Sequence, residues 1–248
     1  MDIQTISEEE AAIRQSLADV TAGIEAACSR SGRKLSDVTL IAVSKTKPVS
    51  MITDAIRAGQ LHFGENKVQE MCEKHNELSD QPITWHLIGH LQKNKVRKAV
   101  AVASLIHSVD SVELAAEIQK EAARIGKVQD ILLEVNIAEE ESKFGLAASE
   151  TPAIAAEIAK FPNVHIRGLM TVAPYTPVPE ENRQYFSALR QLAVDIAQQN
   201  IDNIDMCCLS MGMSNDYEIA VEEGATYVRV GSKIFGERIY ATEGSSAT

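Results

Sequence analysis

The 248-residue chain has few aromatic residues and few cysteines. Aromatic side chains make up 4% of it, and the four cysteines stand at positions 28, 72, 207 and 208. None of them shows the C-x-x-C spacing of zinc and redox motifs, so the sequence supports neither a cysteine zinc site nor a disulfide framework. Cys207 and Cys208 are neighbours in an apolar run. We expect both thiols to be buried.

The chain also lacks positive charge and long hydrophobic runs. It has 24 Lys and Arg against 35 Asp and Glu, a formal net charge of −11, which disfavours a broad nucleic-acid surface because phosphate binding needs clustered cations. No apolar run approaches the roughly 20 residues that a membrane span requires. The first residues are neither basic nor apolar and lead into Glu8-Glu9-Glu10, unlike a signal peptide. A cytoplasmic protein that contacts neither membranes nor nucleic acids is expected.

Eight short apolar runs alternate with helical stretches along the chain. They are continuously apolar, as strands of a parallel sheet covered on both faces should be. Eight strand-then-helix units in a chain of this length favour an α/β fold with a closed (β/α)8 TIM-type barrel. No G-x-G-x-x-G motif follows the first strand, which disfavours a dinucleotide-binding sheet. The expected strands cover 39–44, 61–64, 83–88, 105–109, 131–136, 166–172, 206–210 and 227–230.

Helix signals complete this pattern. Ser7 and Glu10 form a capping box, and apolar residues then recur at helical spacing, which predicts an extra N-terminal helix over about 7–31. Other helices are expected over 50–58, 111–125 and 216–223, each ending at a glycine, and from Thr151-Pro152 onward. No linker is visible, so residues 1–248 are expected to form one domain, with a frayed tail from about 242.

Lys45 follows the first expected strand, where the reactive face of such a barrel lies. Its stem would sit among apolar neighbours, and desolvation or a nearby cation would favour the neutral amine that attacks an aldehyde. The alternative is that Lys45 only reaches solvent or pairs with a carboxylate.

The loops after the seventh and eighth expected strands carry residues suited to a phosphate. Gly212 and Gly231 allow the backbone to approach an anion, and Ser214 and Ser232 supply donors. Ser214 and Asp216 could instead only cap the next helix. A strand-end lysine with a phosphate cradle fits a phosphorylated aldehyde, either pyridoxal 5′-phosphate (PLP) or a sugar phosphate in a Schiff-base aldolase.

Six runs of the sequence closely resemble the pyridoxal-phosphate homeostasis protein family and fall in order over nearly the whole chain. They are AVSKTKP at 42–48, FGEN at 63–66, WHLIGHLQKNK at 85–95, RGLMT at 167–171, LSMGMS at 209–214 and VRVGS at 228–232.

This resemblance implies a barrel like the N-terminal domain of alanine racemase, with PLP held as an aldimine of Lys45. Ser214, Gly231 and Ser232 match the family's phosphate site, with Ser210 nearby. Arg229 matches the arginine that faces the pyridine nitrogen. The resemblance also implies that Asn66 and Met170 line the pocket.

The implied role of Arg229 has a chemical consequence. A charged guanidinium beside the ring nitrogen disfavours its protonation, so the ring becomes a poorer electron sink. Tyr175, Tyr217 and Tyr240 lie in no racemase-like motif, and the racemases' additional β-domain is not recognisable in the sequence. The expected function is therefore PLP binding in vitamin B6 and amino-acid or keto-acid homeostasis, with little or no turnover.

The same residues are compatible with other functions. The protein could be a weak amino-acid racemase or Schiff-base lyase that uses the same lysine, or a cofactor-sensing regulator that acts by protein contact. Expected partners are PLP and apo-enzymes that receive it, and a monomer is expected.

Four further features have ordinary structural explanations as strong as functional ones. His86 and His90 show metal-pair spacing, but a strand and Gly89 interrupt any helix, so no metal site is expected. The basic cluster 93–98 is typical of a solvated helix face. Lys143 matches a lysine of the family that is proposed to contact a second or departing cofactor molecule. Alternatively, it makes an ordinary surface ion pair. The proline-rich segment 173–179 either covers the pocket or is a simple bridge.

Overall fold

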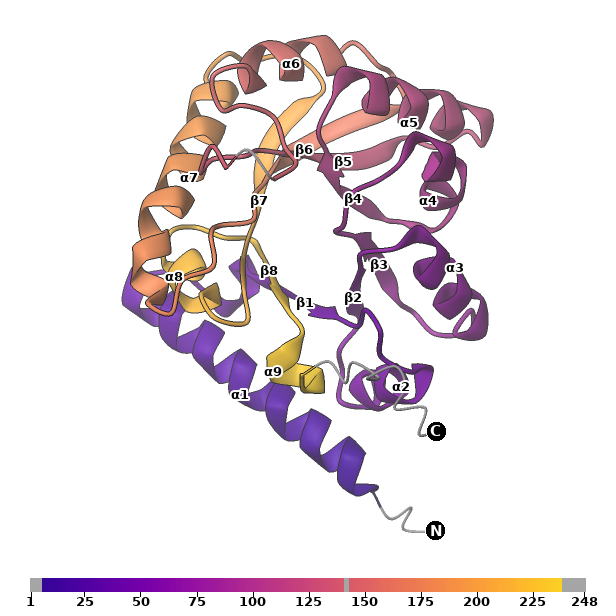
Figure 1. The fold of residues 1–248 in the computed structure, drawn as a ribbon, viewed down its shortest axis with the longest axis vertical. Helices are drawn as coiled ribbons and strands as arrows, with labels where there is room; N and C mark the ends of the chain where they lie inside the picture. Colours follow the sequence, from indigo (N-terminus) through magenta and orange to yellow (C-terminus); the bar gives the residue numbers. More distant parts are fainter. Residues whose placement is uncertain (1–5, 141–142, 238–248) are drawn as a thin grey trace, which may run out of the picture.

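Eight parallel strands close into a barrel in the order β1 to β8 (Figure 1). The computed structural model describes residues 6–140 and 143–237. Each strand pairs with its neighbours along the chain, and β1 closes the barrel by pairing with β8. The predicted barrel is confirmed. The strands are β1 (Thr39–Val43), β2 (His62–Glu65), β3 (Thr84–Leu87), β4 (Leu105–Val109), β5 (Gln129–Glu134), β6 (Val164–Met170), β7 (Ile204–Met213) and β8 (Tyr227–Val230).

Helices follow the strands and surround the barrel (Figure 1). The predicted tail from about 242 lies outside the described residues. The α-helices are α1 (Glu8–Ser31), α2 (Val49–Arg57), α3 (Val68–Glu77), α4 (Val96–Val102), α5 (Val112–Arg124), α6 (Thr151–Ile158), α7 (Arg183–Ala197), α8 (Tyr217–Glu222) and α9 (Ser232–Phe235). Short 3-10 turns cover η1 (Leu35–Asp37), η2 (Lys93–Lys95) and η3 (Pro179–Asn182).

The strands separate two apolar regions. The large one lies between barrel and helices and includes Phe63 and Trp85. A smaller one inside the barrel is contributed by β4 to β7 and consists of Leu105, Leu132, Met170 and Cys208. Because successive side chains of a strand point to opposite faces, strands β4 to β7 contribute to both regions.

The expectation of two buried neighbouring thiols is wrong for Cys207. Cys208 is buried and Cys207 is exposed. The two sulfur atoms lie 3.6 Å apart, so both thiols lie on the same side of β7, and the positive φ of 46° at Met206 interrupts the regular alternation of the strand. Exposure alternates from Ile204 to Cys207, and the strand becomes continuously buried from Cys208 to Gly212, which leaves the Cys207 thiol accessible.

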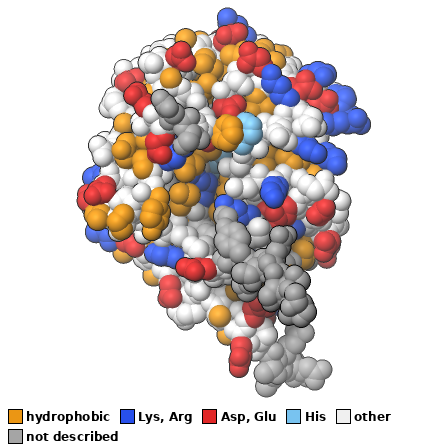
Figure 2. Space-filling view, in the orientation of Figure 1, with side chains coloured by type: hydrophobic (Ala, Val, Ile, Leu, Met, Phe, Trp, Pro, Cys, Tyr) orange, Lys and Arg blue, Asp and Glu red, His pale blue; other side chains and the backbone are white. Residues whose placement is uncertain are grey.

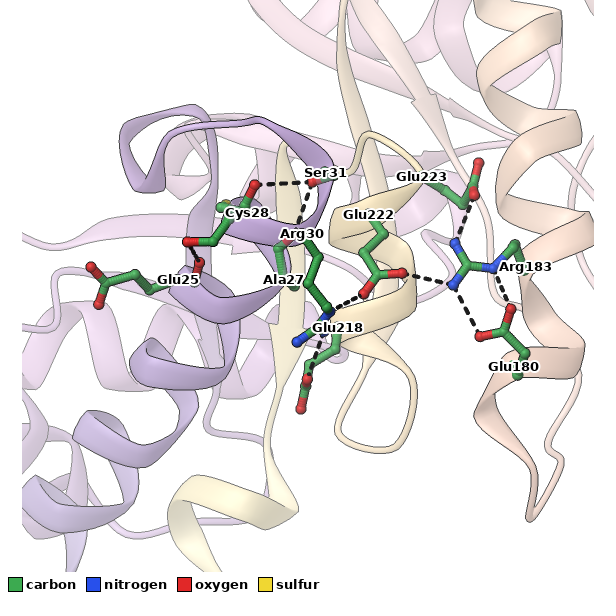
Figure 3. A network of polar contacts seen from close by, with 11 residues as sticks. Glu25, Ala27, Cys28, Arg30, Ser31, Glu180, Arg183, Glu218, Glu222 and Glu223 are labelled. Atoms are coloured by element: carbon green, nitrogen blue, oxygen red, sulfur yellow. Dashed lines mark hydrogen bonds and ion pairs between the residues drawn. The ribbon is translucent and has the colours of Figure 1, made fainter.

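Helix α1 begins where the sequence pattern indicates, with the Ser7 hydroxyl accepting from the Glu10 amide at 3.0 Å. It packs along α8, α2 and α9, outside the barrel. Figure 3 shows how it is tied on: Glu222 of α8 accepts from Arg30 of α1 on one side and from Arg183 of α7 on the other. These ion pairs connect three helices. Within residues 6–140 and 143–237, no helix combines the length and apolarity needed to cross a membrane.

Candidate cofactor site

A cavity of about 430 Å³ opens at the carboxyl ends of the strands. Its volume lies in the range of pockets that hold small molecules and cofactors. Figure 2 shows this face, with Lys and Arg side chains visible in the central hollow. The cavity is lined by Val43, Lys45, Lys47, Asn66, Ile88, Val172, Tyr175, Met213, Ser214, Asn215, Arg229, Gly231, Ser232 and Gly236. Six residues predicted from the sequence, Lys45, Asn66, Ser214, Arg229, Gly231 and Ser232, are among them.

The turn that carries Lys45 is held by acidic side chains from neighbouring elements. Thr46 has a positive φ of 65°, an uncommon conformation for a residue with a branched side chain. Its amide donates to Oε1 of Glu70 on α3 at 2.6 Å. The Ser44 hydroxyl donates to Oε1 of Glu65 at 2.7 Å. Lys45 therefore stands between two residues whose positions are fixed by hydrogen bonds.

A buried lysine completes this arrangement. Nζ of Lys74 donates to the Ser44 carbonyl oxygen, to Glu65 and to Glu70, each at 2.7 Å. Burial raises the pKa of the Glu65 carboxyl, and the Lys74 ammonium counteracts that rise. We call Ser44, Glu65, Glu70 and Lys74 the strand-end clamp. The sequence did not single out Lys74, since nothing local marks a helical lysine as buried.

The loops after β7 and β8 meet at the cavity wall, next to the end of β1. The Gly231 amide donates to the Ser214 hydroxyl at 3.3 Å, so the two predicted phosphate loops are in direct contact. A Cβ atom at position 231 would lie 3.1 Å from the Val43 carbonyl oxygen, which explains the glycine. Gly212 has a φ of 88°, and a Cβ there would come within 2.5 Å of the Ala220 Cβ. Only glycine fits this bend.

Neither Ser214 nor Asp216 caps α8 with its side chain, which was the alternative role suggested by the sequence. Ser214 bonds to Gly231, as described. Asp216 is the residue before α8 and is buried, but its carboxylate accepts from the Met213 amide and from the Asn182 side chain, both at 2.7 Å. The loop after β7 is therefore fixed by Asp216, while Ser214 stays at the cavity wall.

Arg229 lies on β8 with its side chain buried at the floor of the cavity. Its Nη1 donates to the Ser210 hydroxyl at 2.6 Å, and its Nη2 donates to the Thr171 carbonyl oxygen at 2.8 Å. Burial lowers the pKa of Arg229 to about 10, while Glu134 and Asp216 act in the opposite direction. The guanidinium is thus charged at neutral pH and held by two acceptors.

Two predicted site residues lie beneath the cavity and do not line it. Ser210 is fully buried and contacts Arg229. Met170 belongs to the apolar region inside the barrel, beside Leu132 and Cys208. Ser210 can act on a ligand through Arg229, whereas Met170 contributes packing. Their assignment as cofactor-binding residues stays a prediction.

Several lining residues were not predicted from the sequence, of which Lys47, Tyr175 and Asn215 carry polar groups. Nζ of Lys47 donates to the carbonyl oxygens of Phe235 and Glu237, at 2.7 and 3.0 Å, and so ties the end of β1 to the segment after β8. Tyr175 is 89% exposed and comes from the proline-rich segment, which does reach the cavity. Their positions in the sequence could have indicated them, because these residues follow the carboxyl ends of strands.

A second, smaller cavity of about 210 Å³ adjoins the first through Val172. It contains Lys143, which donates to Glu140 at 2.5 Å as the ion-pair alternative expects. Glu134 also lines it, and burial together with the nearby Asp110 raises the pKa of the Glu134 carboxyl to about 7. A carboxyl group that changes charge near neutral pH therefore faces this cavity.

His86 and His90 diverge in space. His86 points into the barrel interior, toward His62 and His107. His90 stacks on Phe144, with ring centroids 4.0 Å apart. In the part of the chain that the structure describes, no cluster of three or more His, Cys, Asp or Glu could hold a metal ion. The basic cluster 93–98 covers η2 and the start of α4, with Lys93, Arg97 and Lys98 exposed.

Comparison with known proteins decides the family. Residues 19–239 match the family described as alanine racemase, N-terminal domain. The pyridoxal phosphate homeostasis protein of Aquifex aeolicus is 43% identical over 224 residues, which cover 90% of this chain and 97% of that protein. The chain belongs to the pyridoxal phosphate homeostasis protein family. The human protein of the same name is 44% identical over 212 residues, covering 82% of this chain and 77% of its own length.

Solved structures support both the family and the fold. PipY of Synechococcus elongatus, in a structure with PLP bound, is 40% identical to this homeostasis-family chain. It superimposes with a TM-score of 0.79 and covers 90% of this chain and 100% of PipY. An alanine racemase of Clostridium difficile superimposes with a TM-score of 0.72 at 13% identity, over 94% of this chain and 58% of the racemase. The racemase shares the barrel fold.

Proposed function

We propose that this protein binds PLP in the cavity at the carboxyl ends of the strands and serves cofactor homeostasis rather than turnover. One observation carries the proposal: Lys45, Arg229 and the Ser214–Gly231–Ser232 loops converge on one cavity from β1, β7 and β8. A solved relative of the same family, PipY, is described with PLP bound. We also propose that residues 1–248 act as one domain.

The residues fit the chemical groups of PLP. Lys45 would supply the amine for covalent attachment to the aldehyde. The Ser214 and Ser232 hydroxyls are donors of the kind that phosphate oxygens accept, and the Gly231 amide, which donates to Ser214 in the structure, lies at the same place. A Cβ at position 231 would crowd Val43 and narrow this part of the cavity, so the glycine fits an anion close to the backbone. Asn66 completes the polar lining.

Arg229 supports a low rate of turnover. When bound, PLP supplies an electron sink for carbanion chemistry, and that sink depends on a protonated ring nitrogen. We propose that the Arg229 guanidinium faces that ring nitrogen. The guanidinium is charged and held by Ser210 and Thr171, so it opposes a second positive charge beside it. Proton abstraction at an amino-acid α-carbon should therefore be slow.

The other titratable lining groups fit this view. Lys47 is engaged with two backbone carbonyl oxygens and Tyr175 is 89% exposed. Neither side chain is held in the way that a general base must be to act on a bound substrate.

Borohydride trapping tests the proposal. The purified protein is incubated with PLP, reduced with borohydride, digested and mapped by mass spectrometry. We expect the label on Lys45 and its loss in Lys45→Ala. Lys67→Ala is the matched control, because Lys67 is exposed and follows the lining residue Asn66. Failure to bind PLP in excess, or a label on another residue, contradicts the proposal.

The enzymatic alternatives are separated by an assay of amino-acid racemisation. We expect little turnover. Rapid, saturable turnover that disappears in Lys45→Ala would favour the racemase alternative. The finer parts of the function are delivery of PLP to apo-enzymes, a monomeric state and a cytoplasmic location, which stay predictions. Transfer to an apo-enzyme in the presence of a trap for free aldehyde distinguishes direct delivery from sensing, since direct transfer should survive the trap.

A further inference from the structure

A row of histidines crosses the barrel interior and ends beneath Arg229. Nδ1 of His62 lies 3.0 Å from Nε2 of His86, and Nδ1 of His86 lies 3.0 Å from Nε2 of His107. Nδ1 of His107 lies 2.9 Å from the Ser210 hydroxyl, which accepts from Arg229 at 2.6 Å. The row begins at the start of β2, near the end of the barrel opposite the cavity, and continues through β3, β4 and β7.

The inner part of this row is uncharged. His107 and Ser210 are fully buried, and His86 is 2% exposed. Burial is the main cause that lowers the pKa of His86 to about 3, and it lowers the pKa of His107 well below its usual value. At neutral pH each of these imidazoles therefore carries one proton on one ring nitrogen. The position of that proton decides which nitrogen donates.

Arg229 fixes the direction of every hydrogen bond in the row. A guanidinium only donates, so Ser210 Oγ must accept from it. Among the described residues, the remaining partner of the Ser210 hydroxyl is Nδ1 of His107. If His107 donated there, the Ser210 proton would be buried without an acceptor, which is costly. Ser210 therefore donates to His107.

The direction then propagates away from the cavity. With Nδ1 of His107 accepting, its proton lies on Nε2 and is donated to Nδ1 of His86. The proton of His86 must likewise lie on Nε2 and is donated to Nδ1 of His62. All bonds point from Arg229 toward the opposite end of the barrel. Such aligned hydrogen bonds strengthen one another in a low-dielectric interior.

We propose that His107 and His86 are positioning residues that act through Ser210 on Arg229. By accepting the Ser210 proton, His107 turns the hydroxyl oxygen toward the guanidinium and keeps Arg229 in place. This inference deepens the proposed function and rests on it, since it assigns the histidine row to the control of how Arg229 faces the cofactor. It adds residues that contact no part of the cavity.

The first test uses the cofactor-free protein. Nitrogen-15 spectra of the histidine side chains report which ring nitrogen carries the proton. We expect His86 and His107 to be neutral and protonated on Nε2 at neutral pH. We expect Ser210→Ala to remove this preference at His107. A proton on Nδ1 of His107 in the wild type, or an unchanged spectrum in Ser210→Ala, would overturn the inference whether or not PLP binds.

The second test compares two substitutions in PLP-loaded protein. His107→Leu removes the acceptor, and we expect the PLP dissociation constant to rise about three- to tenfold, with a shifted absorption band. His107→Asn offers an amide oxygen in place of Nδ1 and should restore most of the affinity. Tyr227→Phe is the control, because its ring packs on His86 and His107 but its hydroxyl lies outside the row. It should match the wild type.

The outcomes separate the two proposals. If the wild type binds PLP at Lys45 but His107→Leu retains it like the wild type and shows the same band, the inference is wrong and the proposed function stands. If the wild type does not bind PLP at all, the proposed function fails, and the nitrogen-15 spectra alone decide the direction of the row. If His107→Leu does not fold, the PLP affinity of His107→Asn and the nitrogen-15 spectra of the wild type still test the inference.

Discussion

Nζ of Lys74 lies 2.7 Å from Oε1 of Glu65 in the interior, next to the turn that carries Lys45. The Lys74 side chain is 6% exposed and that of Glu65 is not exposed. Oε2 of Glu65 has no hydrogen-bond partner among the described residues. Burying such a pair costs desolvation free energy, so it adds little net stability, but removal of one partner leaves a buried charge uncompensated.

Lys74→Met should therefore be strongly destabilising. We expect a loss of about 3–5 kcal/mol in the free energy of unfolding, measured by urea denaturation. The double variant Lys74→Met, Glu65→Leu should recover most of it, because it removes the two most deeply buried charges, and Glu70, whose side chain is 22% exposed, keeps access to water. The exposed Lys98→Met is the matched control and should change stability by less than about 0.5 kcal/mol. A double variant no more stable than the single one would refute this account of the clamp.

The phosphate loops give a prediction about ligand chemistry. Ser232→Ala should weaken PLP binding about tenfold or more, because a hydrogen bond to a charged phosphate contributes roughly 1.5–3 kcal/mol. Binding of pyridoxal, which lacks the phosphate, should be nearly unchanged. Equilibrium dialysis with both aldehydes measures the difference. Ser29→Ala, on the outer face of α1, serves as the control. An equal loss of affinity for both aldehydes would remove Ser232 from the phosphate site.

The barrel could be predicted from the sequence because its signals are local. Most strands are short and rich in apolar residues, and each of the expected strands overlaps an observed one. The positions of Lys45, Ser214 and Ser232 followed from the same reasoning, since residues after parallel strands gather at one end of the barrel. Their convergence on one cavity needed no information beyond strand order.

The supports of the site could not be predicted in this way. Glu65 and Lys74 look like ordinary charged residues in the sequence, and His107 looks like a histidine in an apolar strand. Their roles depend on which side chains meet across β2, α3, β4 and β7, which the sequence pattern does not specify. The same limit explains Cys207, because the apolar run did not reveal that the continuously buried part of β7 begins at Cys208.

The ion pairs of Figure 3 lead to a prediction about salt. Arg183 donates to Glu180, Glu222 and Glu223, and the side chains of Glu222 and Glu223 are largely buried. Arg183→Met should cost about 1–2 kcal/mol, more than an isolated exposed pair, because several carboxylates lose a shared partner. Salt screens these interactions, so the loss should shrink at about 1 M NaCl.

Lys120→Met supplies the comparison for this network. Lys120 pairs with Glu117 on the surface of α5, and its side chain is 68% exposed. Its removal should leave the free energy of unfolding nearly unchanged at either salt concentration. Thermal or urea unfolding at low and high salt measures both variants. Equal effects of the two substitutions would show that the link between α7 and α8 contributes no more than a surface pair.

Glu134 gives a prediction about pH. Burial raises the pKa of its carboxyl to about 7 in the folded protein, whereas an unfolded Glu titrates near 4.3. The folded state therefore binds this proton more tightly than the unfolded state. Its contribution to stability is fully present below about pH 4 and is lost as the pH rises through about 7. At pH 8 the folded protein must hold a partly desolvated carboxylate beside Asp110.

Glu134→Gln should remove this dependence. We expect the variant to be more stable than the wild type by on the order of 1 kcal/mol at about pH 8, and to lose that advantage at about pH 5, where the wild-type carboxyl is mostly protonated. Urea denaturation at the two pH values measures the difference. Glu113→Gln, at an exposed position of α5, should show no such change. A Glu134→Gln variant with the same advantage at both pH values would mean that its carboxyl does not titrate near neutrality.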